Sequence, residues 1–294
     1  MANAVGRRRR FAAGLATMAM ALGFTALPAD AAPVPDVDLV AVGDSYTAGV
    51  GAGSYITPPP CLKTDGGYVD ILEDLAIVDE VINGACSGAI IPPDASWSVP
   101  SVMEQIAALS ASERLSGRTE LVTLTAGAND LDFTTPLTVC AVYTLDICAQ
   151  AVMAARAKLP AIRADLVEAL TAIHRAAPRA RIVVFGYPLL FDPEGLPTVL
   201  TRDAQGLINS GTVALTEAIE QAVDNANAEA KANAVYVDVT DEFARHATNS
   251  TEPWIILDPA AFSDPRNFHP NAAGHDAYAA ALTAEVNLAS IARR

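Results

Sequence analysis

The chain has 294 residues, a formal net charge of −15 and 51% hydrophobic residues. This acidic balance repels nucleic acid and anionic membrane surfaces, so neither is expected as a partner. The length could hold two domains, but α/β folds of this size are often single and no linker divides the chain. We therefore expect one domain over residues 32–294, preceded by a leader.

The first segment has the pattern of a secretion signal. Four arginines at 7–10 precede an apolar run at 11–27, and Ala29-Asp30-Ala31 follows as an A-x-A cleavage motif. The run is too short for a membrane span, and no later segment approaches about 18 consecutive apolar residues. We expect cleavage after Ala31, secretion, and no stable membrane insertion. Arg8-Arg9-Arg10-Phe11 also loosely fits a twin-arginine signal, so both export routes remain open.

Short runs of Val, Ile and Leu on consecutive positions recur along the rest of the chain, as is typical of strands buried on both faces of a parallel sheet. The strand candidates are 37–42, 80–83, 120–125, 181–186 and 235–239. Stretches of helical period lie between or after them, at 67–75, 99–115, 149–176, 203–230 and 271–291. This alternation predicts βαβ units, and hence an α/β sandwich around a parallel sheet.

Two residues mark helix ends: Pro178 closes one helix, and Asn271 is a candidate N-cap of the last. Long irregular segments are expected at 50–65, 131–148, 189–201 and 241–270. Loops of such length are usually functional, and ligands of open α/β sheets bind beyond the carboxyl ends of the strands. The functional residues are therefore expected at that edge.

Four cysteines follow the predicted leader. In an exported protein they are expected to form disulfides, and four cysteines allow three pairings. We predict Cys61–Cys86 and Cys140–Cys148, because each pair joins segments that flank the same face of the predicted sheet. Irregular spacing, the absence of a C-x-x-C motif and the sequence distance to the histidines disfavour a zinc site.

The stretch VAVGDSYTAGVGAG, residues 40–53, leads from the first predicted strand into a glycine-rich turn. Its glycines fit neither G-x-G-x-x-G nor a loop ending in Gly-Lys-Ser/Thr, and prolines at 58–60 prevent the helix that a phosphate site needs. A phosphate-binding loop is therefore excluded. A plain turn and a nucleophilic Ser45 both remain as interpretations.

A serine nucleophile needs a neighbouring base, most often histidine, and the chain has four histidines. His174 and His246 are expected at a helix end or on the surface, and His275 is expected to pack inside the last helix. His269 ends a long loop just before that helix, whose dipole favours a neutral imidazole that accepts a proton. A metal site is disfavoured because the last two histidines lack an obvious third ligand besides nearby aspartates.

Acyl transfer also needs hydrogen-bond donors for the developing oxyanion. Asn129 follows the third predicted strand, where Gly127 lets the backbone turn, and Gly88 follows the second, where the lack of a side chain could expose its N–H. Each of these residues is also common in ordinary turns. Their order, at successive strand ends on one rim with Ser45, favours a functional site.

On these residues the chain resembles the SGNH hydrolases, the GDSL-type lipases and esterases, and in particular their secreted actinomycete branch. The four motifs are Gly43-Asp44-Ser45, Cys86-Ser87-Gly88-Ala89, Gly127-Ala128-Asn129-Asp130 and His269-Pro270-Asn271. They occur in the family's order and extend over nearly the whole predicted mature chain.

The resemblance implies a three-layer α/β/α sandwich with a flavodoxin-like, five-stranded parallel sheet, and the same cysteine pairing. It implies Ser45 as nucleophile and His269 as general base. The oxyanion hole would consist of the backbone N–H groups of Ser45 and Gly88 and the side-chain amide of Asn129. No metal and no organic cofactor is required.

One position departs from the family pattern. An aspartate usually stands three residues before the histidine, and here that position is Arg266. Some relatives orient the histidine with a main-chain carbonyl instead. We expect the Arg266 carbonyl to orient His269 in a dyad, with Asp264 as the second choice that would make a triad. A carbonyl fixes the tautomer but offers less charge than a carboxylate.

The sequence thus predicts a secreted, monomeric ester hydrolase that cleaves lipid or short-chain acyl esters through a Ser45 acyl-enzyme. The alternative is an inactive secreted binding or wall-associated module, which the missing aspartate supports. Lipid esters, short soluble esters, phospholipids and acetylated sugars all fit, because irregular loops shape the pockets. The apolar segments YITPPPCL and WSVPSVM weakly favour an acyl chain over ordinary loop packing.

Overall fold

A five-stranded parallel sheet forms the centre of the computed structural model, which describes residues 36–293. The strands lie in the order β2-β1-β3-β4-β5, so the flavodoxin-like order is confirmed. Their bounds are Val37–Gly43 (β1), Val78–Asn83 (β2), Leu121–Thr125 (β3), Arg181–Phe185 (β4) and Ala234–Val237 (β5). Each predicted strand is present, with ends that differ by no more than two residues.

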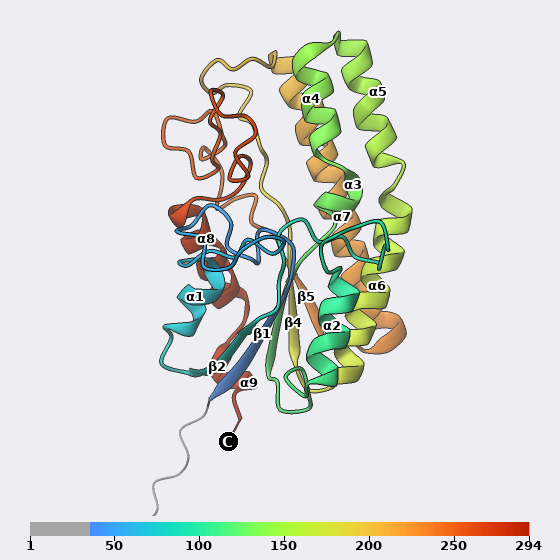
Figure 1. The fold of residues 1–294 in the computed structure, drawn as a ribbon, viewed down its shortest axis with the longest axis vertical. Coiled ribbons are helices and arrows are strands. Elements are labelled where there is room, and N and C mark those ends of the chain that lie inside the picture. Colours follow the sequence, from blue (N-terminus) through green and yellow to red (C-terminus); the bar gives the residue numbers. More distant parts are fainter. Residues whose placement is uncertain (1–35, 294) are drawn as a thin grey trace, which may run out of the picture. The chain divides into compact units, whose positions relative to one another are not determined.

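Consecutive apolar residues form these strands because both faces of the sheet are covered. The central strand β3 is buried at every position, whereas the edge strand β2 has only Ile82 buried. Helices α1 (Tyr68–Glu73) and α8 (Ala272–Glu285) cover one face (Figure 1). Helices α2 (Val102–Ala111), α6 (Leu159–Ala176) and α7 (Arg202–Ala230) cover the other. The three-layer sandwich is therefore confirmed.

One region differs from the prediction. The segment at 131–148, expected to be irregular, contains α4 (Thr134–Val142) and the start of α5 (Leu145–Arg156), after the short α3 (Ala128–Leu131). Helix α4 carries three threonines, two valines and a proline, which weaken its intrinsic helix propensity. It is stabilised instead by packing against α5 and α7.

Two predicted helices are interrupted. The stretch at 149–176 divides into α5 and α6 near Pro160. A proline has no N–H to donate inside a continuous helix, but it is tolerated in the first turn of a new one, and Pro160 stands in the first turn of α6. The last stretch divides into α8 and α9 (Leu288–Ile291). The predicted N-cap of α8 is confirmed, since the side chain of Asn271 accepts a hydrogen bond from the N–H of Gly274 at 3.1 Å.

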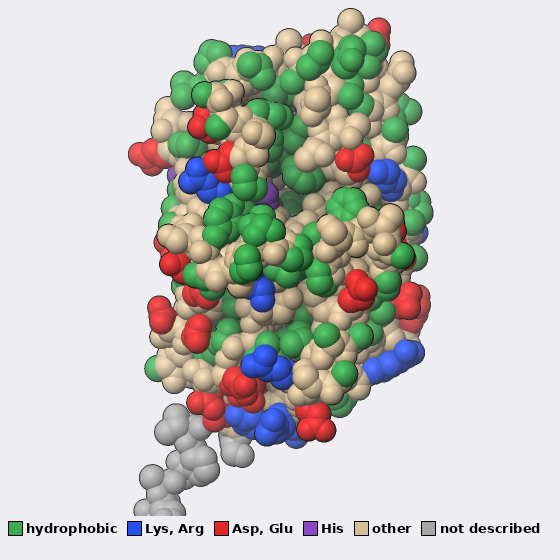
Figure 2. Space-filling model, in the orientation of Figure 1, with side chains coloured by type: hydrophobic (Ala, Val, Ile, Leu, Met, Phe, Trp, Pro, Cys, Tyr) green, Lys and Arg blue, Asp and Glu red, His purple; other side chains and the backbone are tan. Residues whose placement is uncertain are grey.

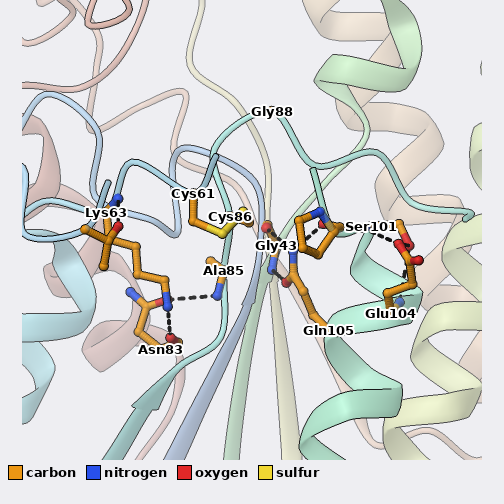
Figure 3. The surroundings of a disulfide bond; sticks show 12 residues. Gly43, Cys61, Lys63, Asn83, Ala85, Cys86, Gly88, Ser101, Glu104 and Gln105 are labelled. Carbon is orange, nitrogen blue, oxygen red and sulfur yellow. Dashed lines mark hydrogen bonds between the residues drawn. A yellow bond between two sulfur atoms is a disulfide. The ribbon is translucent and has the colours of Figure 1, made fainter. Parts of the chain in front are cut away.

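Both predicted disulfides are present, Cys61–Cys86 and Cys140–Cys148, and residues 36–293 contain no free cysteine. The second joins α4 to α5. The first ties the loop before α1 to the segment that follows β2 (Figure 3). The predicted leader, residues 1–31, lies outside the described residues. Within the described part, no helix is long and apolar enough to cross a membrane.

Candidate active site

Ser45 and His269 meet at the carboxyl end of the sheet, although 224 residues separate them in the chain. Ser45 follows β1 directly, and His269 precedes α8. The distance from Ser45 Oγ to His269 Nε2 is 2.6 Å, within hydrogen-bond range. Each residue is 8% exposed. The two predicted catalytic candidates are therefore in contact and largely shielded from water.

The turn that presents Ser45 depends on Gly43. This residue has a φ of +138°, and a Cβ there would lie 2.3 Å from the carbonyl oxygen of Thr125 on β3. Only glycine allows β1 and β3 to approach this closely at the strand end. The side chain of Gln105 in α2 holds both polar backbone groups of Gly43. It accepts from the Gly43 N–H at 2.8 Å and donates to the Gly43 carbonyl at 3.0 Å (Figure 3).

The other nitrogen of the imidazole fixes its tautomer. Nδ1 of His269 lies 2.9 Å from the carbonyl oxygen of Asn267. A carbonyl only accepts, so Nδ1 carries the proton and Nε2 is free to accept from the Ser45 hydroxyl. The orienting carbonyl is thus Asn267, one residue after the expected Arg266. The Arg266 carbonyl instead accepts the backbone N–H of His269 at 3.1 Å, in a turn where Phe268 has a φ of +64°.

The second candidate for orienting the histidine, Asp264, does not contact the imidazole. Its carboxylate binds the Arg266 guanidinium, with Oδ2 and Nη2 2.6 Å apart. This pairing holds the pKa of Asp264 at about 2. The structure therefore presents a serine–histidine pair oriented by a main-chain carbonyl and no carboxylate.

Burial controls the charge of the histidine. Desolvation lowers the pKa of His269 to about 4, and the carbonyls of Asn267 and Arg266 oppose this shift only in part. The imidazole is therefore neutral over the whole neutral and weakly acidic range. This is the form that can accept a proton from a serine hydroxyl.

The three expected oxyanion donors lie around the same point. The backbone N–H groups of Ser45 and Gly88 have no hydrogen-bond partner among residues 36–293. The side-chain nitrogen of Asn129 donates one hydrogen to the carbonyl of Ala89 at 2.9 Å, which leaves its second hydrogen free. Ser45, Gly88, Asn129 and His269 line one common cavity.

Sequence reasoning missed the buried polar network beneath Ser45. The carboxylate of Asp44 accepts hydrogen bonds from the Thr125 hydroxyl at 2.7 Å, the Tyr46 N–H at 3.0 Å and the Tyr187 hydroxyl. Burial raises the pKa of Asp44 to about 6. Tyr187 stands two residues after β4, and this position at a strand end was the available signal. The network fixes the backbone on which Ser45 is mounted.

Two of the other histidines make contacts of their own and do not contact Ser45. His275 is fully buried in α8, where its ring contacts the Tyr68 N–H and the Val50 carbonyl, both at 3.3 Å, so its predicted packing role is confirmed. His246 stacks on Trp254 at 3.7 Å between ring centroids. The described residues contain no cluster of side chains suited to hold a metal ion.

Two cavities of different volume border Ser45. The inner cavity, about 50 Å³, has a mainly apolar lining that includes Leu131, Phe133, Tyr187, Leu190, Leu215 and Phe268. The outer cavity, about 240 Å³, is lined by residues that include Gly88, Thr134, Thr138, Phe262 and Asn267. Figure 2 shows hydrophobic side chains bordering a hollow in which a histidine is visible. A substrate can therefore extend from Ser45 in two directions.

This fold, with a serine and a neutral histidine paired at the carboxyl end of a flavodoxin-like sheet, defines an SGNH-type hydrolase. Residues 41–277 match the model of the GDSL-like Lipase/Acylhydrolase family. The chain therefore belongs to that family, and it is a carboxylic ester hydrolase.

Individual relatives agree with this assignment. A lipase of Streptomyces rimosus is 30% identical over 269 residues, which are 88% of this chain and 90% of that protein. The crystal structure of an extracellular lipase from S. rimosus matches with a TM-score of 0.71 at 26% identity, covering 85% of this chain and 100% of that one. A phospholipase A1 from Streptomyces albidoflavus has the same TM-score and coverage at 25% identity.

Asp264→Asn is expected to leave kcat within about threefold of wild type, because the Asn267 carbonyl and not this carboxylate contacts the imidazole. In enzymes with a true Ser-His-Asp triad, the equivalent change costs about 10⁴ in kcat. Steady-state hydrolysis of a soluble p-nitrophenyl ester measures the effect. A loss of several orders of magnitude in a folded variant would instead identify Asp264 as the third member of a triad.

The acid limb of the pH profile is expected near pH 4. If neutral His269 is the base, kcat/KM stays on its plateau at pH 5.5 and halves near pH 4, where the shifted pKa lies. A histidine with an ordinary pKa of about 6.5 would be about nine-tenths protonated at pH 5.5. Rates between pH 3.5 and 8, with fluorescence to monitor unfolding at each pH, measure this. A midpoint near 6.5 would contradict it.

Proposed function

We propose that the protein is a secreted lipid-ester hydrolase that works through an acyl-enzyme on Ser45. The observation that carries this proposal is the 2.6 Å contact between the Ser45 hydroxyl and the unprotonated Nε2 of His269. Serine is a weak nucleophile unless an adjacent base removes its proton. A buried imidazole in this tautomer supplies that base.

The chemistry follows from these positions. As Ser45 Oγ attacks the ester carbonyl, its proton passes to Nε2 of His269, and the carbonyl oxygen becomes an oxyanion. The N–H groups of Ser45 and Gly88 and the free hydrogen of the Asn129 amide stabilise that charge. The imidazolium then protonates the leaving alcohol oxygen as the tetrahedral intermediate collapses. In the second half, water attacks the acyl carbonyl and gives a proton to His269. The intermediate then collapses, the carboxylic acid leaves, and the imidazolium returns the proton to Ser45 Oγ.

Orientation of the base comes from Asn267. Its carbonyl keeps the proton on Nδ1 and compensates part of the imidazolium charge formed during the reaction. A carbonyl carries only a partial charge, so it stabilises the imidazolium less than a carboxylate would. The Ser-His pair acts as a dyad in this mechanism.

Three features support secretion. The N-terminal segment has the pattern of a signal peptide with cleavage after Ala31. The two disulfides belong in an oxidising compartment. The related S. rimosus lipase of known structure is described as extracellular.

The inner cavity is the better site for the acyl chain. Its lining is mainly apolar, and it borders a distal cavity of about 40 Å³ enclosed by residues that include Val152, Ile208 and Gly211. The two cavities adjoin, since both are lined by Leu131, Phe133, Leu190 and Thr212. Relatives named lipase and phospholipase A1 support a lipid ester as the substrate. The wider outer cavity would then hold the alcohol part of the ester.

Ser45→Ala is expected to abolish ester hydrolysis. The purified mature protein would be tested on p-nitrophenyl esters from acetyl to palmitoyl, and an organophosphonate probe would label Ser45 in the wild type only. The serine hydroxyl is the only group lost, so folding is expected to be unchanged. Equal activity in the variant, or an inactive wild type with both disulfides formed, would refute the proposed mechanism.

Gly211→Leu is expected to shift the chain-length preference toward short esters. A Cβ at Gly211 would lie 3.7 Å from Val152, so a longer side chain would extend into the distal cavity. Losing burial of two or three methylenes, at about 0.8 kcal/mol each, lowers the octanoyl-to-butyryl ratio of kcat/KM roughly 15- to 60-fold. Gly206→Leu, on an exposed face of α7, is the matched control. An unchanged ratio in the Gly211 variant would place the acyl chain elsewhere.

A further inference from the structure

The loop that carries Gly88 is held in place by hydrogen bonds on both sides of that residue. The N–H of Ser87 donates to the carbonyl of Cys61 at 2.9 Å, and the N–H of Ala89 donates to the carbonyl of Cys86 at 3.0 Å. The disulfide between Cys61 and Cys86 joins the two segments directly below Gly88 (Figure 3). The N–H groups of the residues before and after Gly88 are hydrogen-bonded. The N–H of Gly88 itself has no partner among residues 36–293, and Gly88 lines the same cavity as Ser45 and His269.

The far end of the loop is held by the motif that contains Asn129. The amide of Asn129 binds the carbonyl of Ala89 at 2.9 Å. The carboxylate of the next residue, Asp130, accepts the N–H of Ile91, also at 2.9 Å. Two of the three oxyanion donors are thereby connected to each other through the loop.

Trp97 supplies a third restraint, on Gly88 itself. Its indole Nε1 donates to the carbonyl oxygen of Gly88 at 2.8 Å. A tight turn fixes the tryptophan, because its backbone N–H donates to the Asp94 carbonyl at 2.9 Å while the Asp94 carboxylate binds Ser96. The side chain of Trp97 is 47% exposed, and it is absent from the described residues that line the inner and outer cavities.

Gly88 needs such a restraint because it has no side chain to pack. Its φ of +83° lies in the region that glycine enters freely, so its two flanking peptide planes can rotate at little cost. Oxyanion stabilisation depends on donors that are already aimed before the charge develops. A rotation at Gly88 would turn its N–H away from the oxyanion without altering where the substrate binds.

We infer that Trp97 is a positioning residue for the reaction: its indole N–H holds the Gly88 carbonyl, in the peptide plane next to the one that carries the Gly88 N–H, and so limits the rotation at Gly88 that would turn this N–H away from the oxyanion. This inference rests on the proposed function, since Gly88 must be an oxyanion donor for its orientation to matter. It assigns a use to an exposed tryptophan that neither contacts the base nor lines the substrate cavities.

The test is Trp97→Phe, which keeps an aromatic ring and removes the N–H donor. Removing an oxyanion donor outright costs about 10² to 10³ in kcat, so loosening one is expected to cost about tenfold. The expected result is an equal fall in kcat and kcat/KM with KM unchanged, the signature of an interaction made only in the transition state. Affinity for a boronic acid, whose serine adduct is tetrahedral, should fall by a similar factor while the melting temperature stays within about 2 °C.

Trp254→Phe is the matched control, because Trp254 is the second of the two tryptophans and stacks on His246 away from Ser45. Its kcat should equal that of the wild type. The inference is overturned if Trp97→Phe retains full kcat, if it raises KM alone, or if both variants lose activity equally. Failure of the proposed function would look different, since the wild type would then be inactive or Ser45→Ala would remain active.

Discussion

The hydrogen bond between Ser45 and His269 is the constraint on which the site depends, because it must hold two loops together across most of the chain. The sheet brings the end of β1 and the start of α8 to one rim, but a second contact sets their spacing. The hydroxyl of Tyr46, next to the serine, donates to the carbonyl of Phe268, next to the histidine, at 2.8 Å. Burial then keeps the imidazole neutral and ready to accept a proton.

The residues beneath Ser45 are polar and buried, and their hydrogen bonds hold the turn in place. Asp44, Thr125 and Tyr187 are buried, so each polar atom must find a partner, and the resulting network leaves the Ser45 turn one arrangement. Gln105 closes the same turn from α2 through both polar groups of Gly43. A reaction that tolerates little displacement of its nucleophile benefits from this degree of fixation.

The substrate cavities lie on a different kind of structure. Helices α4, α5 and α7 supply most of the lining of the distal cavity, and α4 is joined to α5 by the Cys140–Cys148 disulfide. They rise beyond the sheet beside the upper part of α7 (Figure 1). The chemistry thus belongs to the strand ends, whereas chain-length preference would be set by helices packed above them. This separation allows one family to retain a mechanism while its substrates vary.

The sequence by itself determined the strands, their order through family resemblance and both disulfides, and it singled out Ser45 and His269 as the two side chains that meet at the sheet edge. Each of these rests on a local pattern or on a motif of fixed composition. Tertiary structure alone decided that Nδ1 of His269 lies 2.9 Å from the Asn267 carbonyl, while the Arg266 carbonyl accepts the backbone N–H of His269. Helix α4, the Asp44 network and the tryptophan bond to Gly88 were likewise outside the reach of sequence. They depend on side-chain contacts made only in the folded chain, whose geometry no sequence pattern encodes.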